Sequence, residues 1–260
     1  MSLPTAFVIN LKKRSDKRAD IDNMMTNITC MDYEFVDAVE RTSGTIGCAL
    51  SHIKVLNLAK SKAMPAVIVM EDDNMIVDYE RFNGLFPRLF SWLLDNHSRW
   101  DFFNGNPARS VIGNPKKIVW MRQELGLCKY DWGTSTNFVI YNSRIYDKFI
   151  EDKRMILTSR IDRVPIDKAI NDIANKGRLT VYPFLTQHKP GFSDISQKEK
   201  NATASINESS NFIGAKLRYN HSLCGRCRNL WGSLIYKLGR LIYELGRLIC
   251  KLGERLQVYY

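Results

Sequence analysis

The 260-residue sequence lacks the uninterrupted run of ~18 apolar residues that a membrane-spanning helix needs. It has no basic segment before its first apolar run and no A-x-A cleavage site, so we expect no signal peptide. Its six cysteines are scattered and do not resemble the disulfide framework of a small secreted domain. Together these absences predict a cytoplasmic protein, with a peripheral position on a membrane as an open alternative.

The net charge of +11 is distributed unevenly. Residues 216–260 contain nine Lys and Arg against two Glu, whereas the first 215 residues contain 29 basic and 25 acidic side chains. The basic character therefore belongs to the C-terminal tail. The cations of this tail alternate with apolar residues and form no stripe with stacking aromatics, which argues against a nucleic-acid partner.

Hydrophobic periodicity predicts strands that alternate with helices. The expected strands cover residues 6–11, 33–38, 66–70, 100–103, 117–122, 137–141 and 179–182, the last of them closing the sheet. The expected helices cover residues 15–25, 45–62, 81–94, 143–151 and 165–176, with Ser15 capping the first and Pro165 in the first turn of the last. This alternation predicts an α/β fold with a mostly parallel sheet flanked by helices.

Beyond residue 190 the composition changes twice. Residues 191–210 are rich in Ser, Asn and Lys, which is typical of a mobile loop or linker. Three heptads then follow one pattern over residues 234–254, with Leu recurring at alternating spacings of four and three. We therefore expect a catalytic domain over 1–200, a linker over 201–222 and a basic amphipathic helical tail over 223–260.

The tail is expected to need a partner surface. Gly239, Gly246 and Gly253 each cost a helix about 1 kcal/mol relative to alanine, so the segment is not expected to be stable alone. One candidate partner is a membrane surface, which the basic flank and Trp231 favour. The other is a second copy of the chain, which would form a short coiled coil and a homo-oligomer.

A buried-type strand over residues 66–70 ends directly on three acids, Glu71, Asp72 and Asp73. Acids at the carboxyl end of such a strand lie where open α/β sheets bind their ligands. Three adjacent negative charges repel one another, and a hard cation such as Mg²⁺ or Mn²⁺ would relieve that repulsion. The alternative is an acidic turn after a core strand.

Two other segments carry groups suited to binding or catalysis. Asn10, Arg14 and Arg18 lie at the carboxyl end of the first strand and at the start of a helix, where amide groups and cations receive a diphosphate well. The alternative for these residues is a solvated basic helix face. Ser51 and His52 form a polar pair inside an otherwise apolar helix, and a buried histidine there can also be a hydrogen-bonded structural residue.

Taken in order, these segments resemble glycosyltransferase family 25, which includes bacterial lipopolysaccharide galactosyltransferases and collagen hydroxylysine galactosyltransferases. The family pattern is an apolar strand followed by N-L-x-R-R-x-x-R, then G-C-x-x-S-H, then I-x-E-D-D. The matching segments here are 10–18, 47–52 and 69–73, with weaker matches at 36–38, 132–134, 165–167 and 193–195. The resemblance covers residues 5–200, and the heptads have no counterpart in that pattern.

The resemblance implies a GT-A fold that uses a UDP-sugar donor, UDP-galactose or UDP-glucose, with Mn²⁺ or Mg²⁺. It implies inverting transfer of a hexose, commonly galactose, to a hydroxyl group of a glycan or hydroxylysine acceptor. The competing interpretation is a non-catalytic, membrane-peripheral adaptor with a degenerate transferase domain. The intact acid triplet argues against that interpretation.

The candidate site residues have distinct roles in this chemistry. Asp73, assisted by Glu71, would hold the metal, and His188 is a candidate metal or diphosphate ligand unless it is a plain surface-loop residue. Asp72 would assist the metal or bind the ribose. The other donor-binding candidates are Asn10, Arg14 and Arg18 for the diphosphate, Asp37 for the uracil or ribose, and Ser51 and His52 in the donor pocket. Asp167 is the candidate catalytic base, with stabilisation of a helix N-terminus as its alternative role.

Two tail cysteines, Cys224 and Cys227, follow His221 at spacings that suggest a zinc site. Only three ligands are present locally, whereas structural zinc normally has four. Reduced cysteines without a metal are therefore the favoured interpretation.

Overall fold

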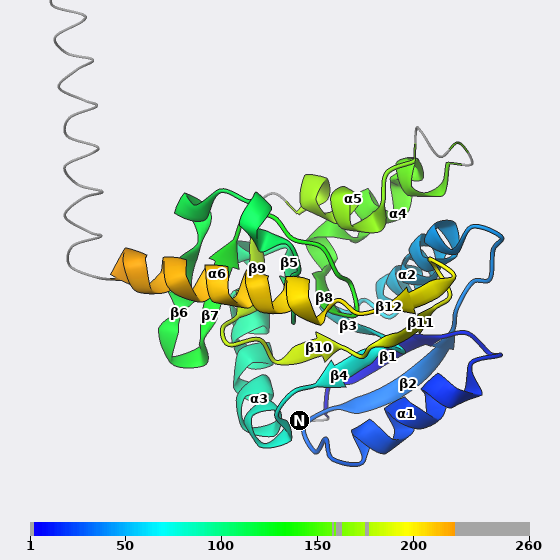
Figure 1. The fold of residues 1–260 in the computed structure, drawn as a ribbon, viewed down its shortest axis with the longest axis horizontal. Coiled ribbons are helices and arrows are strands. Elements are labelled where there is room, and N and C mark those ends of the chain that lie inside the picture. Colours follow the sequence, from blue (N-terminus) through cyan, green and yellow to red (C-terminus); the bar gives the residue numbers. More distant parts are fainter. Residues whose placement is uncertain (1–2, 158, 160–162, 175–176, 222–260) are drawn as a thin grey trace, which may run out of the picture. The chain divides into compact units, whose positions relative to one another are not determined.

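The computed structural model describes residues 3–157, 159, 163–174 and 177–221 (Figure 1). The chain divides into two units, Met1–Lys216 and Leu217–Tyr260, and the sheet and candidate site belong to the first. The predicted tail, 223–260, lies outside the described residues. Within the described part of the chain, no helix combines the length and apolar character needed to cross a lipid bilayer.

An eight-stranded sheet runs through the first unit in the order β2-β1-β3-β8-β5-β9-β7-β6. Its strands are β1 Thr5–Asn10, β2 Asp32–Asp37, β3 Ala66–Glu71, β5 Phe102–Asn104, β6 Val119–Arg122, β7 Leu127–Tyr130, β8 Phe138–Asn142 and β9 Arg178–Val181. β1 is parallel to β2 and β3, and β5 is parallel to β9. β8 is antiparallel to β3 and β5, and β7 is antiparallel to β6 and β9. All strands except β7 and β8 therefore share one direction, which confirms the predicted α/β fold with a mostly parallel sheet.

Helices cover both faces of this sheet (Figure 1). The helices packed on its two faces are α1 Ser15–Met25, α2 Gly44–Ser61, α3 Tyr79–Asp95, α4 Tyr146–Glu151 and α5 Ile166–Ile173. Successive β1 side chains point to opposite faces: Ala6 and Val8 pack with α1 and α3, and Phe7 and Ile9 pack with α2, α4 and α5. Because both faces are covered, the central strands are almost continuously apolar, and this is why their positions were predictable from sequence.

Shorter elements complete the described structure. β4 Asn74–Ile76 pairs with β10 Thr186–His188, β11 Gly191–Ser193 forms a hairpin with β12 Lys198–Lys200, and α6 covers Thr203–His221. The 3-10 helices are η1 His97–Arg99, η2 Ser110–Ile112, η3 Pro115–Lys117, η4 Gln123–Leu125, η5 Ser143–Ile145 and η6 Lys153–Ile156. The segment predicted as a linker, 201–222, is therefore largely helical, and the loop predicted from residue 191 begins with a hairpin.

Three local predictions were wrong. The strand over 179–182 does not close the sheet, because the unpredicted strand β7 pairs with β9 and carries β6 to the edge. Ser15 is the first residue of α1, and the capping position is Arg14, with no side-chain hydrogen bond. Pro165 occupies the cap of α5 and not its first turn.

Candidate functional site

The candidate site lies where β1 and β3 end. The two strands are parallel neighbours, and Ile9 is the register partner of Glu71, so their carboxyl ends meet at one edge of the sheet. A pocket of about 190 Å³ opens at this edge. Its walls come from the end of β1 and the segment after it, the segment between β2 and α2, one face of α2, the acid triplet 71–73 and the β11–β12 hairpin.

Asp72 is held by the side chains of Asn10, the last residue of β1, and Lys17 of α1. Its carboxylate accepts a hydrogen bond from Asn10 Nδ2 at 2.9 Å and pairs with Lys17 Nζ at 3.0 Å. Burial raises the pKa of Asp72 above its ordinary value, while the Lys17 ammonium opposes this shift. The segment 10–18 and the acid triplet 71–73 are thus in direct contact.

Asp73 forms a pair with His188. The register of β10 on β4 places His188 opposite Asn74, and His188 Nε2 lies 3.1 Å from Asp73 Oδ2. The other oxygen, Asp73 Oδ1, is buried and has no hydrogen-bond partner among the described residues. Burial and the nearby Glu71 carboxylate raise the pKa of Asp73 to about 8, and burial lowers the pKa of His188. An added positive charge would stabilise the ionised form of Asp73 and satisfy its second oxygen.

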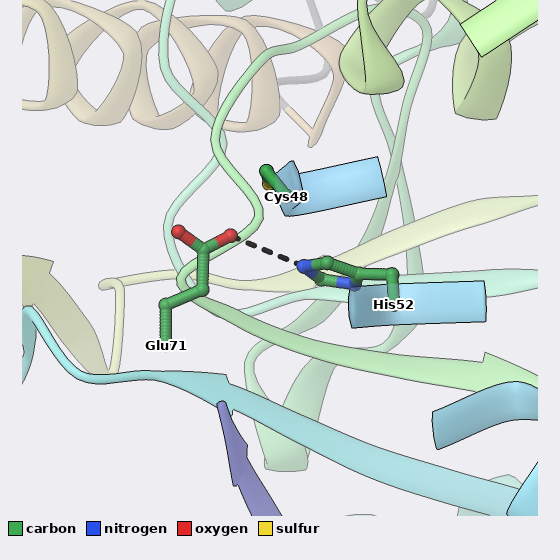
Figure 2. A group of neighbouring side chains, drawn as sticks. All are labelled: Cys48, His52 and Glu71. Carbon is green, nitrogen blue, oxygen red and sulfur yellow. Dashed lines mark hydrogen bonds and ion pairs between the residues drawn. The ribbon is translucent and has the colours of Figure 1, made fainter. Parts of the chain in front are cut away.

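Glu71 is turned toward α2 (Figure 2). Its Oε1 lies 3.2 Å from His52 Nε2 and accepts a hydrogen bond from Thr136 Oγ1 at 2.5 Å. Burial opposes ionisation of Glu71, but the hydrogen bonds from His52 and Thr136 hold its pKa below the ordinary value, at about 2. His52 is fully buried, and its Nδ1 lies 2.9 Å from Tyr141 Oη. Since a carboxylate only accepts, the His52–Glu71 hydrogen bond requires a proton on His52 Nε2.

Asp167 reaches the same centre from the first turn of α5. Its carboxylate accepts the backbone N–H of Ser135, and burial together with the Glu71 charge raises the pKa of Asp167 to about 6. Ser135 has a positive φ of 81°, in the region that L residues rarely adopt. The next residue, Thr136, bonds to Glu71. The loop at 135–136 therefore contacts both Glu71 and Asp167, the candidate base.

The cations predicted to bind the diphosphate have separate positions. Arg14 bonds to Asp16 through two hydrogen bonds of 2.9 and 2.7 Å and also pairs with Asp194 of the β11–β12 hairpin. Arg18 does not line the pocket, because its guanidinium lies 4.0 Å from the centroid of the Phe35 ring on β2. Arg14 is therefore near the pocket, whereas the position of Arg18 fits packing of α1 on the sheet.

Asp37 and Ser51 lie beside the segment that connects β2 to α2. Asp37 is half exposed at the end of β2 and pairs with Lys12 at 3.2 Å. Ser51 Oγ accepts the N–H of Val39 at 2.8 Å and donates to the Gly47 carbonyl at 2.7 Å. Ser51 thereby fixes a wall of the pocket, and its hydroxyl is fully engaged with backbone groups.

The structure brings the predicted site residues together in part. The pocket is lined by five of the predicted residues: Glu71, Asp72, Asp73, Ser51 and His52. Three others lie outside the pocket lining but interact with these residues: Asn10 bonds to Asp72, His188 pairs with Asp73, and Asp167 is influenced by the charge of Glu71. Within the predicted metal set, Asp73 contacts His188, whereas Glu71 is engaged by His52 and Thr136. A carboxylate with an unpartnered oxygen beside an imidazole fits a divalent cation such as Mn²⁺.

Three site residues were missing from the sequence prediction: Lys17, Thr136 and Asp194. Lys17 belongs to the basic segment after β1, Thr136 follows the weak family match at 132–134, and Asp194 lies within the one at 193–195. The sequence motifs therefore pointed to these positions, but they did not predict which residues these side chains contact. Arg14 and Asp194 are 180 positions apart, and Thr136 and Glu71 are 65 positions apart, so only the tertiary structure pairs them.

No protein-family model and no curated protein sequence matches this chain. Among solved structures, the chain is similar to apo UDP-glucose pyrophosphorylase, with a TM-score of 0.38, 11% identity and coverage of 82% of this chain and 80% of that one. A glycosyltransferase involved in glycosylation of the major capsid of PBCV-1 gives a TM-score of 0.44, 10% identity and coverage of 82% and 100%. The glycosyltransferase GlyE of Streptococcus pneumoniae TIGR4 gives 0.40, 8% identity and coverage of 70% and 45%.

Proposed function

We propose that this chain is a glycosyltransferase of the GT-A type, related to family 25, that transfers a hexose from a UDP-sugar to a hydroxyl group. The observation that carries the proposal is the Asp73–His188 pair, with a buried, unpartnered carboxylate oxygen at the edge of the sheet. Galactose is the proposed hexose, from the sequence resemblance, and a glycan or hydroxylysine is the proposed acceptor.

Asp73 and His188 would hold a divalent cation, Mn²⁺ or Mg²⁺, with Glu71 as a further candidate ligand. When bound, that cation supplies positive charge to the departing diphosphate. Lys17 and Arg14 supply further positive charge from the segment after β1, and each is now paired with an aspartate that a diphosphate would replace. Asn10 and Asp72 lie beside them, where a ribose hydroxyl can be bound.

Asp167 is the proposed base for inversion. Its pKa of about 6 means that the carboxylate is ionised at neutral pH yet basic enough to accept a proton from an acceptor hydroxyl. The Ser135 N–H fixes the orientation of that carboxylate. Asp167 belongs to α5, whereas Asp73 follows β3 and His188 belongs to β10. In this proposal the base and the leaving group lie on opposite sides of the transferred sugar.

The second candidate is a non-catalytic adaptor that keeps the donor pocket without turnover. Both proteins would bind UDP, so the release of UDP from UDP-galactose and UDP-glucose with Mn²⁺ distinguishes them. Binding of a membrane surface or of a second copy through residues 223–260 stays a prediction from the sequence.

Isothermal titration of the full chain with UDP, with and without Mn²⁺, tests the proposal. We expect Asp73→Asn to weaken the Mn²⁺-dependent binding about tenfold or more, ~1.4 kcal/mol, and to change metal-free binding little. Asp147→Asn is the control, because that carboxylate pairs with Lys60 on the exposed surface. A parent chain that binds no UDP, or an Asp73→Asn variant that binds as the parent does, would contradict the proposal.

A further inference from the structure

The thiol of Cys48 has no part in the proposed transfer reaction, yet it lies beside two of the site residues. Cys48 and His52 are four positions apart on α2, so they share one face of the helix. Glu71 faces them from the end of β3 (Figure 2). The ligand atoms of these three side chains all lie within 4.8 Å of one another, an arrangement that no other trio of His, Cys, Asp and Glu adopts in the described part of the chain.

Two of these three side chains are already oriented by a second contact. Tyr141 Oη lies 2.9 Å from His52 Nδ1, and Thr136 Oγ1 lies 2.5 Å from Glu71 Oε1. If a cation took the Nε2 lone pair, the imidazole proton would move to Nδ1 and be donated to the Tyr141 oxygen. Metal-binding histidines usually donate their other N–H group in this way. The supporting contacts of a metal site are therefore present before any metal binds.

We propose that Cys48, His52 and Glu71 form a site for a thiophilic divalent cation such as Zn²⁺, with a fourth position open to the pocket at the sheet edge. Sulfur, imidazole and carboxylate ligands suit Zn²⁺, whereas Mg²⁺ prefers oxygen ligands alone. Ligand atoms around a tetrahedral Zn²⁺ are about 3.5 Å apart, and the His52–Glu71 distance is already 3.2 Å. All three residues line the pocket, which provides the entry path.

The charges balance when the cation binds. A free thiol is protonated at neutral pH, because its ordinary pKa is ~8.5. Binding forms the sulfur–metal bond and releases the thiol proton to solvent. One thiolate and one carboxylate then neutralise the two positive charges of the ion. This inference does not rest on the proposed function, since it uses neither a nucleotide nor an acceptor.

Cobalt spectroscopy on the full chain tests the site. Replacing Cys224, Cys227 and Cys250 with serine removes the tail thiols and leaves the free cysteines Cys30, Cys48 and Cys128. We expect Co²⁺ to produce a thiolate-to-metal charge-transfer band in this background, and Zn²⁺ to abolish that band by competition. Adding Cys48→Ser should remove the band, whereas the matched control Cys30→Ser should keep it.

A background protein without the band, or a band that survives Cys48→Ser, would overturn the proposal. Circular dichroism verifies that each variant is folded. Titration of Zn²⁺ into the background protein gives a second measurement that needs no change at Cys48. We expect release of about one proton per ion near neutral pH, and at least tenfold weaker binding after Glu71→Gln. Zn²⁺ binding without proton release would also overturn it.

Discussion

Three neighbouring carboxylates in this chain have three different environments. Glu71 accepts hydrogen bonds from His52 and Thr136, and its pKa is lowered. Asp72 pairs with Lys17 but is buried, and its pKa is raised. Asp73, beside His188 with one unpartnered oxygen, has a pKa of about 8. The three acids are adjacent in sequence but have different partners. Glu71 bonds to His52 of α2, Asp72 pairs with Lys17, and Asp73 is the metal-ligand candidate beside His188.

At the same scale, Asp167 gives a prediction about pH. The proposed base would act when deprotonated, so the rate of UDP release with donor and Mn²⁺ should rise with pH and level off above about pH 6. We expect Asp167→Asn to lower that rate about 10²- to 10⁴-fold while UDP binding is retained.

The matched control is Asp172→Asn on the same helix, where the carboxylate pairs with Arg154 and is partly exposed. The steady-state rate of UDP release is measured for the parent and both variants across a pH series. If Asp167→Asn turned over donor at the parental rate, Asp167 would not be the base.

At the scale of elements, the site depends on the β11–β12 hairpin lying against the start of α2. A Cβ on Gly44, the first residue of α2, would lie 2.6 Å from Ile195 Cα and 3.1 Å from the Asp194 carbonyl oxygen. Glycine is therefore required because two backbones approach each other there. The Arg14–Asp194 ion pair ties the same hairpin to the segment between β1 and α1.

We predict that Gly44→Ala displaces the hairpin, because the clash is with backbone atoms that cannot rotate away. Limited trypsin digestion should then cut faster after the exposed Lys198 and Lys200. Gly84→Ala in α3 is the matched control: no atom lies within 4 Å of its added Cβ, so the change should stabilise the fold by about 0.5–1 kcal/mol. Equal digestion rates for the parent and Gly44→Ala would contradict this account of the hairpin.

At the scale of the whole molecule, the buried carboxylates make folding stability depend on pH. The folded pKa of Asp73, about 8, is above the ordinary value of 3.8. Its contribution to stability is therefore complete below about pH 3.8 and is lost as pH rises through about 8. Asp167 contributes in the same direction up to about pH 6. His188 has a lowered pKa, so it opposes this trend only up to its ordinary value of 6.5.

Between about pH 6.5 and 8.5 the Asp73 contribution should dominate. With a chelator present, we expect the Tm of the parent to fall across this window by at least about 2–4 °C, the equivalent of ~1 kcal/mol in a domain of this size. Asp73→Asn, which cannot ionise, should flatten the slope, and the exposed-pair variant Asp147→Asn should not. Thermal unfolding at several pH values measures all three proteins, and equal slopes for the parent and Asp73→Asn would refute the prediction.

The sequence by itself determined the α/β alternation, the bounds of the central strands within a residue or two, and the position of Glu71, Asp72 and Asp73 at a sheet edge. These features follow from local periodicity and from the rule that parallel strands end at one edge. Only the tertiary structure placed β9 inside the sheet, Arg18 over Phe35, Asp194 on Arg14, and Cys48 and His52 against Glu71. The physical reason is that these contacts join residues far apart in the chain, and their energies depend on burial and distance, which no local pattern of residues encodes.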